Sequence, residues 1–465
     1  MEDFLNPHAH VALRKFPYPY HAMLAIQSDI DMTTPSWFES YHRFLNTLDY
    51  DGRFQEKGLG LDIGDSFFVA GFGLEPSLWH CRWRYNSEAD YLERPDQYSN
   101  EPDQARRPDR KLIYPLAPDF IEKYIRTGWI DFLHGGIAAT VQDIAAAGYE
   151  PRVMDWSRIN GQQYYCWLLQ RDLLGYIDTF VNHWQVTSNF GNNHPTSKGD
   201  TLTHPAYWHD VAEESGIRFT WSYVPGTRCD HSHSDFGVDT LLKPVEFADG
   251  RRGWHFERYL HGQDDSDYSS AANRVHLALN RENLDSLVRN HRYEIYYTHL
   301  GYWLQQVNGV WRPVAHDDPW PESVDAFKLL QDYVKKGKIL VAKSSRVLRY
   351  NLAQENLQYE PRRGSDRIGI HITRIADPQF GSFVPRFNDL RGITFYCKRP
   401  DCTDVFINGR KIRSALLTRN PPDDWGRWPS ITVKWWDPDT ADYTQRTLAQ
   451  VRELHLLDEP DWEDQ

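Results

Sequence analysis

Few features of this sequence are those of secreted, membrane-spanning or nucleic-acid-binding proteins. Only five of its 465 residues are cysteines, and they are scattered, which is typical of a chain that folds without a disulfide framework. No stretch of about 18 apolar residues exists, so we expect no membrane-spanning helix. The first residues lack the apolar run of a secretory signal. These absences favour a cytoplasmic protein.

The chain also has no excess of positive charge. Its 52 Lys and Arg residues are outnumbered by 65 Asp and Glu residues, which gives a net charge of −13, and no long Lys/Arg run occurs. This balance argues against nucleic acid or an anionic membrane as the main partner. The length fits one large domain and one smaller domain. The oligomeric state is left open.

Aromatic side chains are abundant. They make up 14% of the chain and include 18 Trp and 26 Tyr residues. Most such rings fill a large core, whereas exposed rings with apolar faces and polar tips stack on sugars. Composition alone does not separate these two interpretations.

Short apolar segments alternate with helical patterns over the first three quarters of the chain. Residues 22–28 form an apolar run typical of a buried strand, and Thr34-Pro35 then begins a helix with apolar residues at helical spacing. Further expected strands are 61–69, 129–133, 176–181, 218–224, 293–298 and 338–342. About seven strands alternating with helices predict an α/β barrel or an open parallel sheet, whose active site lies at the carboxyl ends of the strands.

Two long polar segments, at about 73–112 and 225–280, interrupt this alternation. We expect them to be surface loops over a site. The pattern changes after residue 355, so we predict an α/β catalytic domain over 1–355 and a small β-rich domain over 356–465.

The β-rich domain is predicted from short β-type segments separated by turn residues. These segments are 368–375, 392–396, 403–407 and 431–436. Asn408-Gly409 is a strong hairpin signal. The region is typical of a small β-sandwich.

Four of the expected strands end in acids or histidines. Asp29 and Asp31 follow the first strand, and His134, His183 and His299 follow three others. A single histidine after a strand is most often structural. Four such positions in one α/β domain would converge on one edge of the sheet, which favours a functional site.

A carboxylate and two imidazoles are a common ligand set for a divalent metal in hydrolases. Such an ion lowers the pKa of bound water. A second carboxylate then accepts the proton of that water, and another histidine protonates the leaving group. The sequence thus predicts a site for a divalent metal, with Zn first and Co, Mn or Ni as alternatives.

Several residues near these strand ends are candidate substrate-binding groups. Asn182, Trp184 and Asn189 are expected to recognise sugar hydroxyls, and Asp65 either faces the site or caps a neighbouring element. Asp200 and His209 are also candidates, although they could simply be polar surface residues. Trp221 is a further candidate that could instead belong to the core.

The strand-end motifs resemble a known family. Asp29-Ile30-Asp31, the strand ending in Tyr-Thr-His-Leu-Gly at residues 297–301 and the other strand-ending histidines are similar to the NodB-homology polysaccharide deacetylases, especially divergent WbmS-like members associated with O-antigen biosynthesis. The resemblance covers about residues 20–352. It implies a distorted (β/α)7-type barrel of the polysaccharide deacetylase kind. It also implies that Asp29 is the base, Asp31 the metal-binding acid and His299 the acid catalyst.

The chain departs from the typical family pattern at three points. Asp-Ile-Asp replaces the adjacent Asp-Asp-Gly, and no second histidine lies three or four residues from His134. His183 is therefore the expected second imidazole ligand, beside His134. The arginine motif of the family has no clear counterpart.

These observations predict a metal-dependent hydrolase that acts on a carbohydrate and removes an N- or O-acyl group from a polysaccharide or glycan precursor. Two alternatives remain open. One is a glycoside hydrolase on the same barrel. The other is a catalytically inactive glycan-binding protein, since the second histidine pair is missing.

Overall fold

The computed structural model describes residues 11–30, 33, 35–54, 56–68, 118–135, 156–182, 188–191, 197–204, 206–221, 236–260, 270–307, 310–315, 319–454 and 456.

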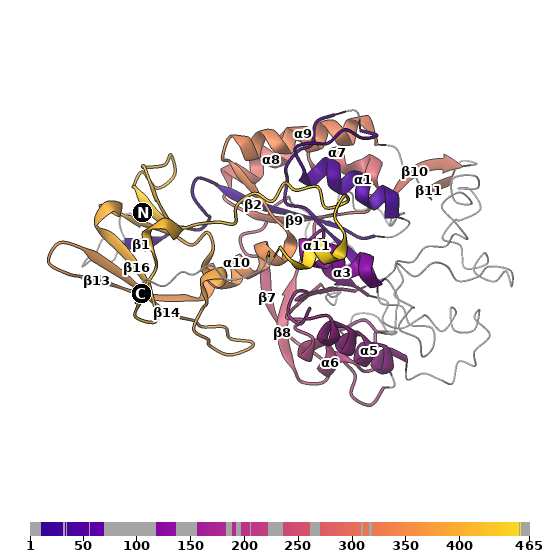
Figure 1. Cartoon of the computed structure of the whole chain (residues 1–465), viewed down its shortest axis with the longest axis horizontal. Coiled ribbons are helices and arrows are strands. Elements are labelled where there is room, and N and C mark those ends of the chain that lie inside the picture. The colour runs from indigo at the N-terminus through magenta and orange to yellow at the C-terminus, as the bar shows by residue number, and fades with distance from the viewer. Residues whose placement is uncertain are drawn as a thin grey trace.

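The α/β part of the chain is built on a nine-stranded sheet (Figure 1). The strand order is β12-β2-β3-β4-β5-β6-β8-β7, and β9 also pairs with β2. Neighbouring strands run parallel except for β7 and β8, which are antiparallel. The strands are β2 (Ala22–Ser28), β3 (Gly64–Phe68), β4 (Ile130–His134), β5 (Thr179–Val181), β6 (Phe219–Trp221), β7 (Leu242–Glu246), β8 (Arg252–Phe256), β9 (Tyr293–Thr298) and β12 (Ile339–Val341).

The sheet is curled, and the chain that follows β8 reaches β9. Tyr259 forms an isolated parallel bridge with Tyr296. In this bridge the Tyr259 amide donates to the Ile295 carbonyl at 2.8 Å, and the Tyr297 amide donates to the Tyr259 carbonyl at 2.9 Å. This curled α/β sheet is compatible with the distorted barrel that the sequence predicts.

The first βα unit shows why these segments form. All residues of β2 are buried, as expected for a strand covered on both faces. The helix α1 (Pro35–Asn46) begins with a proline, which fits the first helical position, and it buries an aromatic stripe that includes Trp37, Tyr41 and Phe44. Leu48, two residues beyond the helix, is 53% exposed.

Helices around the sheet share one hydrophobic core with it (Figure 1). In this view α1, α7, α8 and α9 lie above the strands, and α5 and α6 lie below them. The helices are α3 (Pro118–Thr127), α5 (Trp156–Gln170), α6 (His209–Glu214), α7 (Val275–Ala278), α8 (Arg281–Arg289), α9 (Pro321–Lys335) and α10 (Ser344–Asn356).

The polar segment 225–280 differs from its predicted loop. Its described part contains β7 and β8, and β8 is a member of the main sheet. Polar residues in β8, such as His255, interrupt the apolar pattern expected of a buried strand, so the sequence does not predict it. His255 is nevertheless only 4% exposed. An unpredicted hairpin of β10 (Tyr302–Val307) and β11 (Val310–Ala315) follows β9. The other predicted loop, 73–112, lies outside the described residues.

The β-rich lobe contains two four-stranded sheets, in agreement with a β-sandwich-like domain. One sheet has the order β13-β14-β16-β17, and the other has the order β1-β15-β19-β18. Apolar residues from both sheets belong to one hydrophobic core. The strands are β1 (Val11–Leu13), β13 (Leu357–Arg363), β14 (Ile368–Ile375), β15 (Thr394–Cys397), β16 (Thr403–Ile407), β17 (Arg410–Lys411), β18 (Leu417–Asn420) and β19 (Ser430–Val433).

The predicted hairpin at Asn408-Gly409 is confirmed. These two residues join the antiparallel strands β16 and β17 and have φ angles of 47° and 83°. Two positive φ angles are the requirement of a type I′ turn, which Asn and Gly meet at low cost.

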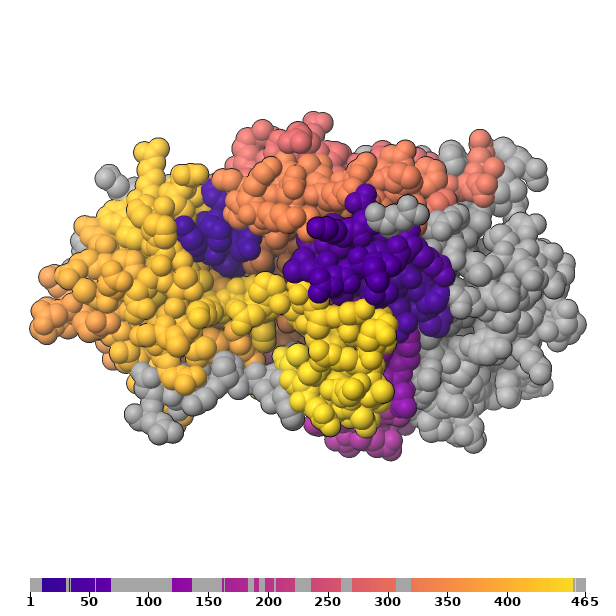
Figure 2. Space-filling view, turned by 45° about the horizontal axis from the view of Figure 1, so that its top comes forward, coloured from indigo at the N-terminus to yellow at the C-terminus, as the bar shows by residue number. Residues whose placement is uncertain are grey.

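Both ends of the described chain cross between the two parts. The N-terminal strand β1 pairs with β15 in the β-rich lobe. After β19 the chain returns to the α/β part, where α11 (Leu448–Arg452) packs on α3 and Arg452 binds Glu122 at 2.6 and 2.7 Å. Figure 2 shows this C-terminal segment, in yellow, lying against the indigo N-terminal region and the magenta segment of α3.

Among the described residues, no helix has the length and apolar character needed to cross a membrane.

Arg14 is a buried charge at the junction of the two parts. Its guanidinium lies 2.9 Å from Asp423 and donates to four backbone carbonyls, those of Phe16, Pro17, Pro19 and Tyr20. We expect Arg14→Met to lower the free energy of unfolding by about 3–5 kcal/mol, because Asp423 keeps a buried charge without its cation. Urea denaturation measures this loss.

The matched control is Arg362→Met, because Arg362 and Glu360 form an ion pair with 59% and 62% exposed side chains. Its loss is expected to stay below about 1 kcal/mol. Equal losses in the two variants would contradict the structural role given to Arg14.

Candidate active site

The two predicted catalytic residues lie side by side at the carboxyl edge of the sheet. In the β2–β9 register, Ser28 is the partner of Thr298, so the next residues, Asp29 and His299, are also adjacent. The Asp29 amide donates to the Thr298 carbonyl at 2.9 Å, which continues the ladder to the end of both strands. Neighbouring parallel strands lie about 4.8 Å apart, so the backbones of the two residues lie close together at this edge of the sheet.

Asp29 is a buried carboxylate with two nitrogen-bearing neighbours. It is 1% exposed. Oδ2 lies 3.3 Å from Nε2 of His134, the last residue of β4. Nη1 of Arg258 lies 3.2 Å from Oδ1 and 3.4 Å from Oδ2. The guanidinium charge compensates the charge of Asp29, which would otherwise be costly at this depth.

Arg258 is fixed between two aromatic rings. Its guanidinium carbon lies 4.0 Å from the centre of the Trp221 ring and 3.9 Å from that of the Tyr297 ring. The side chain is 1% exposed. A planar guanidinium can stack on rings and bind a carboxylate at the same time, and a lysine cannot reproduce this combination. The stack fixes the position of the cation against Asp29.

Hydroxyl groups surround the imidazole of His299. Ser270 Oγ and Tyr302 Oη lie 2.8 and 3.0 Å from Nδ1, and Tyr297 Oη lies 3.2 Å from Nε2. A hydroxyl donates or accepts as needed, so these groups can hydrogen-bond either tautomer of the ring. His299 is 6% exposed. The arrangement suits a group that releases and regains a proton.

Asp65 is placed beneath the strand ends and has no exposed surface. It accepts hydrogen bonds from the Tyr41 hydroxyl and from the Ser66 amide, the latter at 2.7 Å, and it is also bonded to Ser28. Burial raises the pKa of this carboxyl to about 7, against the lowering effect of the hydrogen bonds. Asp65 therefore stabilises the residues beside the site through its hydrogen bonds. Its complete burial does not fit a direct contact with substrate.

Two further hydrogen bonds hold the backbone that follows Asp29 and His299. The Ile30 amide donates to Ser66 Oγ at 2.9 Å, and the Leu300 amide donates to Ser28 Oγ at 3.2 Å. The residues that follow Asp29 and His299 are therefore both bonded to side chains of the sheet.

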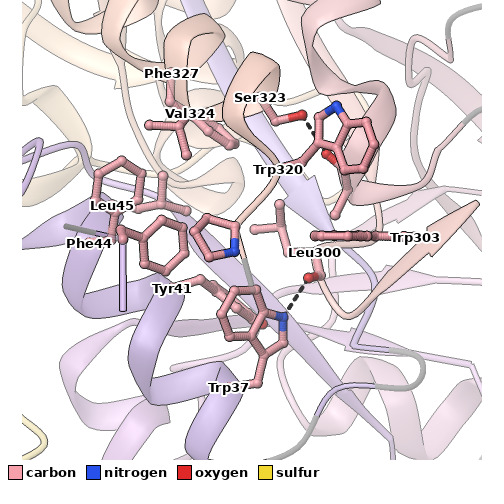
Figure 3. A pocket seen from close by; sticks show the side chains of 13 residues that line it. Trp37, Tyr41, Phe44, Leu45, Leu300, Trp303, Trp320, Ser323, Val324 and Phe327 are labelled. Carbon is pink, nitrogen blue, oxygen red and sulfur yellow. Dashed lines mark hydrogen bonds between the residues drawn. The ribbon is translucent and has the colours of Figure 1, made fainter. Parts of the chain in front are cut away.

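A small apolar pocket adjoins Leu300 (Figure 3). Its volume is about 30 Å³, enough for one or two waters or a small apolar group. The Leu300 carbonyl accepts from Nε1 of Trp37 at 2.8 Å, and Trp303 meets Trp320 edge-on at 4.8 Å. The pocket has no ionisable side chain other than the Tyr41 phenol, so the chemistry of the site rests on the strand ends.

Of the other predicted substrate-binding residues, Asn182, Asn189 and Trp221 are buried. The Asn182 side chain bonds both the amide and the carbonyl of Phe190, at 3.0 and 2.8 Å, and so closes a loop. The Asn189 carbonyl accepts from the Gly199 amide at 2.9 Å. Trp221 does belong to the site, although as the ring that holds Arg258.

Asp200 and His209 are not brought to Asp29. Asp200 accepts from the Ala248 amide at 3.1 Å, and Nδ1 of His209 lies 2.8 Å from Asp249. Residues 247–251 form the turn between β7 and β8, which lies at the amino end of β8. Asp29 lies at the opposite end of the parallel strands, so Asp200 and His209 stabilise this distant turn.

The predicted metal site is only partly within the described residues. Asp31 and His183 lie outside them, as does Trp184. Where the structure describes side chains, no three His, Cys, Asp or Glu residues come together as a metal-binding group. His134, the one predicted metal ligand that the structure describes, lies 3.3 Å from Asp29, so the predicted ligand and the predicted base are side by side.

The sequence pattern predicts neither Arg258 nor the hydroxyl groups around His299 as site residues. Arg258 follows β8, within the segment 225–280 that is predicted to be a loop, so the pattern offers no arginine for the site. The run Trp254-His255-Phe256 carries a strand signal that would have directed attention to it. No local signal marks Ser270, because it reaches His299 only through the tertiary fold.

Comparisons with protein-family models, with curated proteins and with solved structures gave no match for this chain.

Asp65 generates a prediction about pH. Its folded-state pKa of about 7 lies above the ordinary value of 3.8, so the folded protein holds a proton that the unfolded chain releases. Its contribution to stability is complete below about pH 4 and is lost as the pH rises to about 7, at most roughly 4 kcal/mol. Urea denaturation between about pH 4.5 and about pH 7.5 measures this loss. The free energy of unfolding should decline less with rising pH in Asp65→Asn than in the parent protein.

The matched control is Asp325→Asn, whose carboxyl is 77% exposed and should leave the pH dependence unchanged. The same decline in Asp65→Asn and in the parent would show that Asp65 ionises in its ordinary range.

Proposed function

We propose that this protein is a metal-dependent hydrolase that removes an N- or O-acyl group from a carbohydrate. The observation that carries the proposal is that Asp29 and His299 lie at neighbouring strand ends. Asp29 is paired there with Arg258, and His299 is contacted by the Ser270 hydroxyl. A base and an acid on two sides of one position are the minimum needed for hydrolysis of an ester or amide.

Asp29 is the proposed base. Arg258 and His134 hold its carboxylate in one orientation, and the burial of all three side chains excludes competing water. A carboxylate so held accepts a proton from a water molecule at the carboxyl edge of the sheet. Arg258 is a positioning residue, since it acts through Asp29.

His299 is the proposed acid. Ser270 and Tyr302 fix its Nδ1 side, which leaves Nε2, beside the Tyr297 hydroxyl, as the atom that delivers a proton to the leaving group. Tyr297 also supports Arg258 with its ring. One tyrosine therefore connects the base half of the site to the acid half.

His134 would hold a divalent metal together with Asp31 and His183, and its 3.3 Å distance to Asp29 is compatible with an ion at this edge. When bound, such an ion lowers the pKa of water and polarises the acyl carbonyl. The carbohydrate substrate and the deacetylase-type barrel are supported by the resemblance of the strand-end motifs to the polysaccharide deacetylases.

The base and acid assignments are tested with Asp29→Asn and His299→Gln. We expect each to lower the release of acetate from acetylated amino-sugar oligomers by about 10²–10⁴-fold, as is usual on removal of a general acid or base. The assay uses protein with added Zn²⁺ and compares it with protein treated with a chelator. Reducing ends are counted in parallel, because a glycoside hydrolase would form them without acetate.

Matched controls are Asp325→Asn and His371→Gln, which lie on α9 and β14 and should retain full activity. Full activity in both site variants, or new reducing ends as the product, would contradict the proposal.

Arg258 offers a second test. In Arg258→Lys the charge remains but the stacking between Trp221 and Tyr297 is lost, so we expect the activity to fall by at least about tenfold with the fold retained. Arg258→Met should in addition destabilise the protein by about 3–5 kcal/mol, because Asp29 loses its buried cation. Activity and urea denaturation measured on both variants separate the two effects. An Arg258→Lys variant as active as the parent would show that positioning by the stacked guanidinium is unnecessary.

A further inference from the structure

A groove of about 580 Å³ lies where the α/β part meets the β-rich lobe. One wall comes from the end of α3, the start of β4 and the first turns of α10, and the other from residues 386–391 and 435–439. Figure 1 shows α10 at this junction, between the lobe and the sheet. The volume falls within the roughly 300–1,000 Å³ of ligand sites, which often occur between domains.

The groove lies away from the candidate active site. It includes Thr127, Gly128 and Ile130 at the amino end of β4, whereas His134 is at the carboxyl end of that strand. A strand of this length spans about 13 Å. A ligand in the groove therefore occupies a different site from a substrate at Asp29.

Many charged side chains line the groove, and their positive and negative charges nearly balance. It contains six cationic side chains and four carboxylates. Three further carboxylates just outside the lining bind four of the cations: Asp62 binds Lys343 and Arg346, Asp178 binds Arg349, and Glu122 binds Arg126. The groove thus presents many paired donors and acceptors without the excess of positive charge that attracts a phosphate or another anion.

Aromatic rings complete the walls. Trp436 projects from the C-terminal segment to meet an arginine of each wall, with Arg346 at 4.6 Å and Arg391 at 4.3 Å from its ring centre. Trp435 and Tyr350 meet edge-on at 6.0 Å, and Tyr176 also lines the groove. Indole rings next to arginine and aspartate side chains match the apolar C–H faces and paired hydroxyls of a sugar.

We propose that this groove is a second binding site, and that it takes an uncharged oligosaccharide. Arginine and carboxylate side chains of the two walls bond the sugar hydroxyls, and the tryptophans contact its C–H faces. The site does not depend on the chemistry at Asp29. In a hydrolase with a polymeric substrate, it would hold a part of the glycan distant from the scissile bond.

Isothermal titration with three neutral probes, cellotetraose, chitotetraose and mannotetraose, tests the proposal on the full chain. At least one probe is expected to bind, and Trp436→Ala is expected to raise its dissociation constant by about tenfold or more. Arg386→Ala, whose parent side chain is 75% exposed and which should fold normally, is expected to raise it severalfold. Inorganic phosphate and tetragalacturonate serve as anionic probes and should bind more weakly.

The matched control is Arg362→Ala, an exposed arginine of β13 outside the groove, which should leave the affinity unchanged. Asp29→Asn should also retain binding. Loss of binding in Asp29→Asn would place the sugar at the candidate active site and overturn this proposal without affecting the proposed function. No binding of any neutral probe, unchanged affinity in both groove variants, or tighter binding of either anionic probe would also overturn it.

Discussion

The ion pair between Asp29 and Arg258 is the interaction on which the organisation of the site depends. Two charges that are each about 1% exposed are stable only if each compensates the other and the geometry is fixed. Trp221 and Tyr297 supply that geometry from β6 and β9, and Asp29 extends from β2. Correct pairing therefore requires strands from several parts of the chain to be in register. The pair also occupies the place where the segment after β8 bridges to β9, so the curl of the sheet and the assembly of the site are parts of the same structure.

The surroundings of His299 follow a different principle. Three hydroxyl groups contact the imidazole, those of Ser270, Tyr297 and Tyr302. Neutral hydroxyls orient a ring without fixing its charge, which suits proton transfer in both directions. Asp65 lies deeper, where burial favours its protonated form. The site thus combines an ion pair at Asp29 with hydroxyl groups at His299, and Tyr297 contacts both Arg258 and His299.

The sequence predicted those features that depend on local pattern. The strands β2, β14 and β16 have the predicted bounds, because each is an apolar run with clear turn or acid signals at its ends. The placement of Asp29, His134 and His299 at strand ends follows from the same pattern. Features that depend on long-range contacts were missed. Arg258 looks like a surface residue until Trp221 and Tyr297 cover it, and His209 looks like a substrate-binding residue until the turn at Asp249 accounts for its hydrogen bond.

The interlocked chain ends have a consequence for how the molecule is made. Strand β1 completes a sheet of the β-rich lobe, and Arg14 contacts Tyr396 across 382 positions of sequence. Closing so large a loop is slow and must wait until the later strands exist. During synthesis the segment around β1 therefore remains without its partner until nearly the whole chain has emerged. The lobe is then the last part to consolidate, and α11, which follows it and packs on α3, secures the finished arrangement.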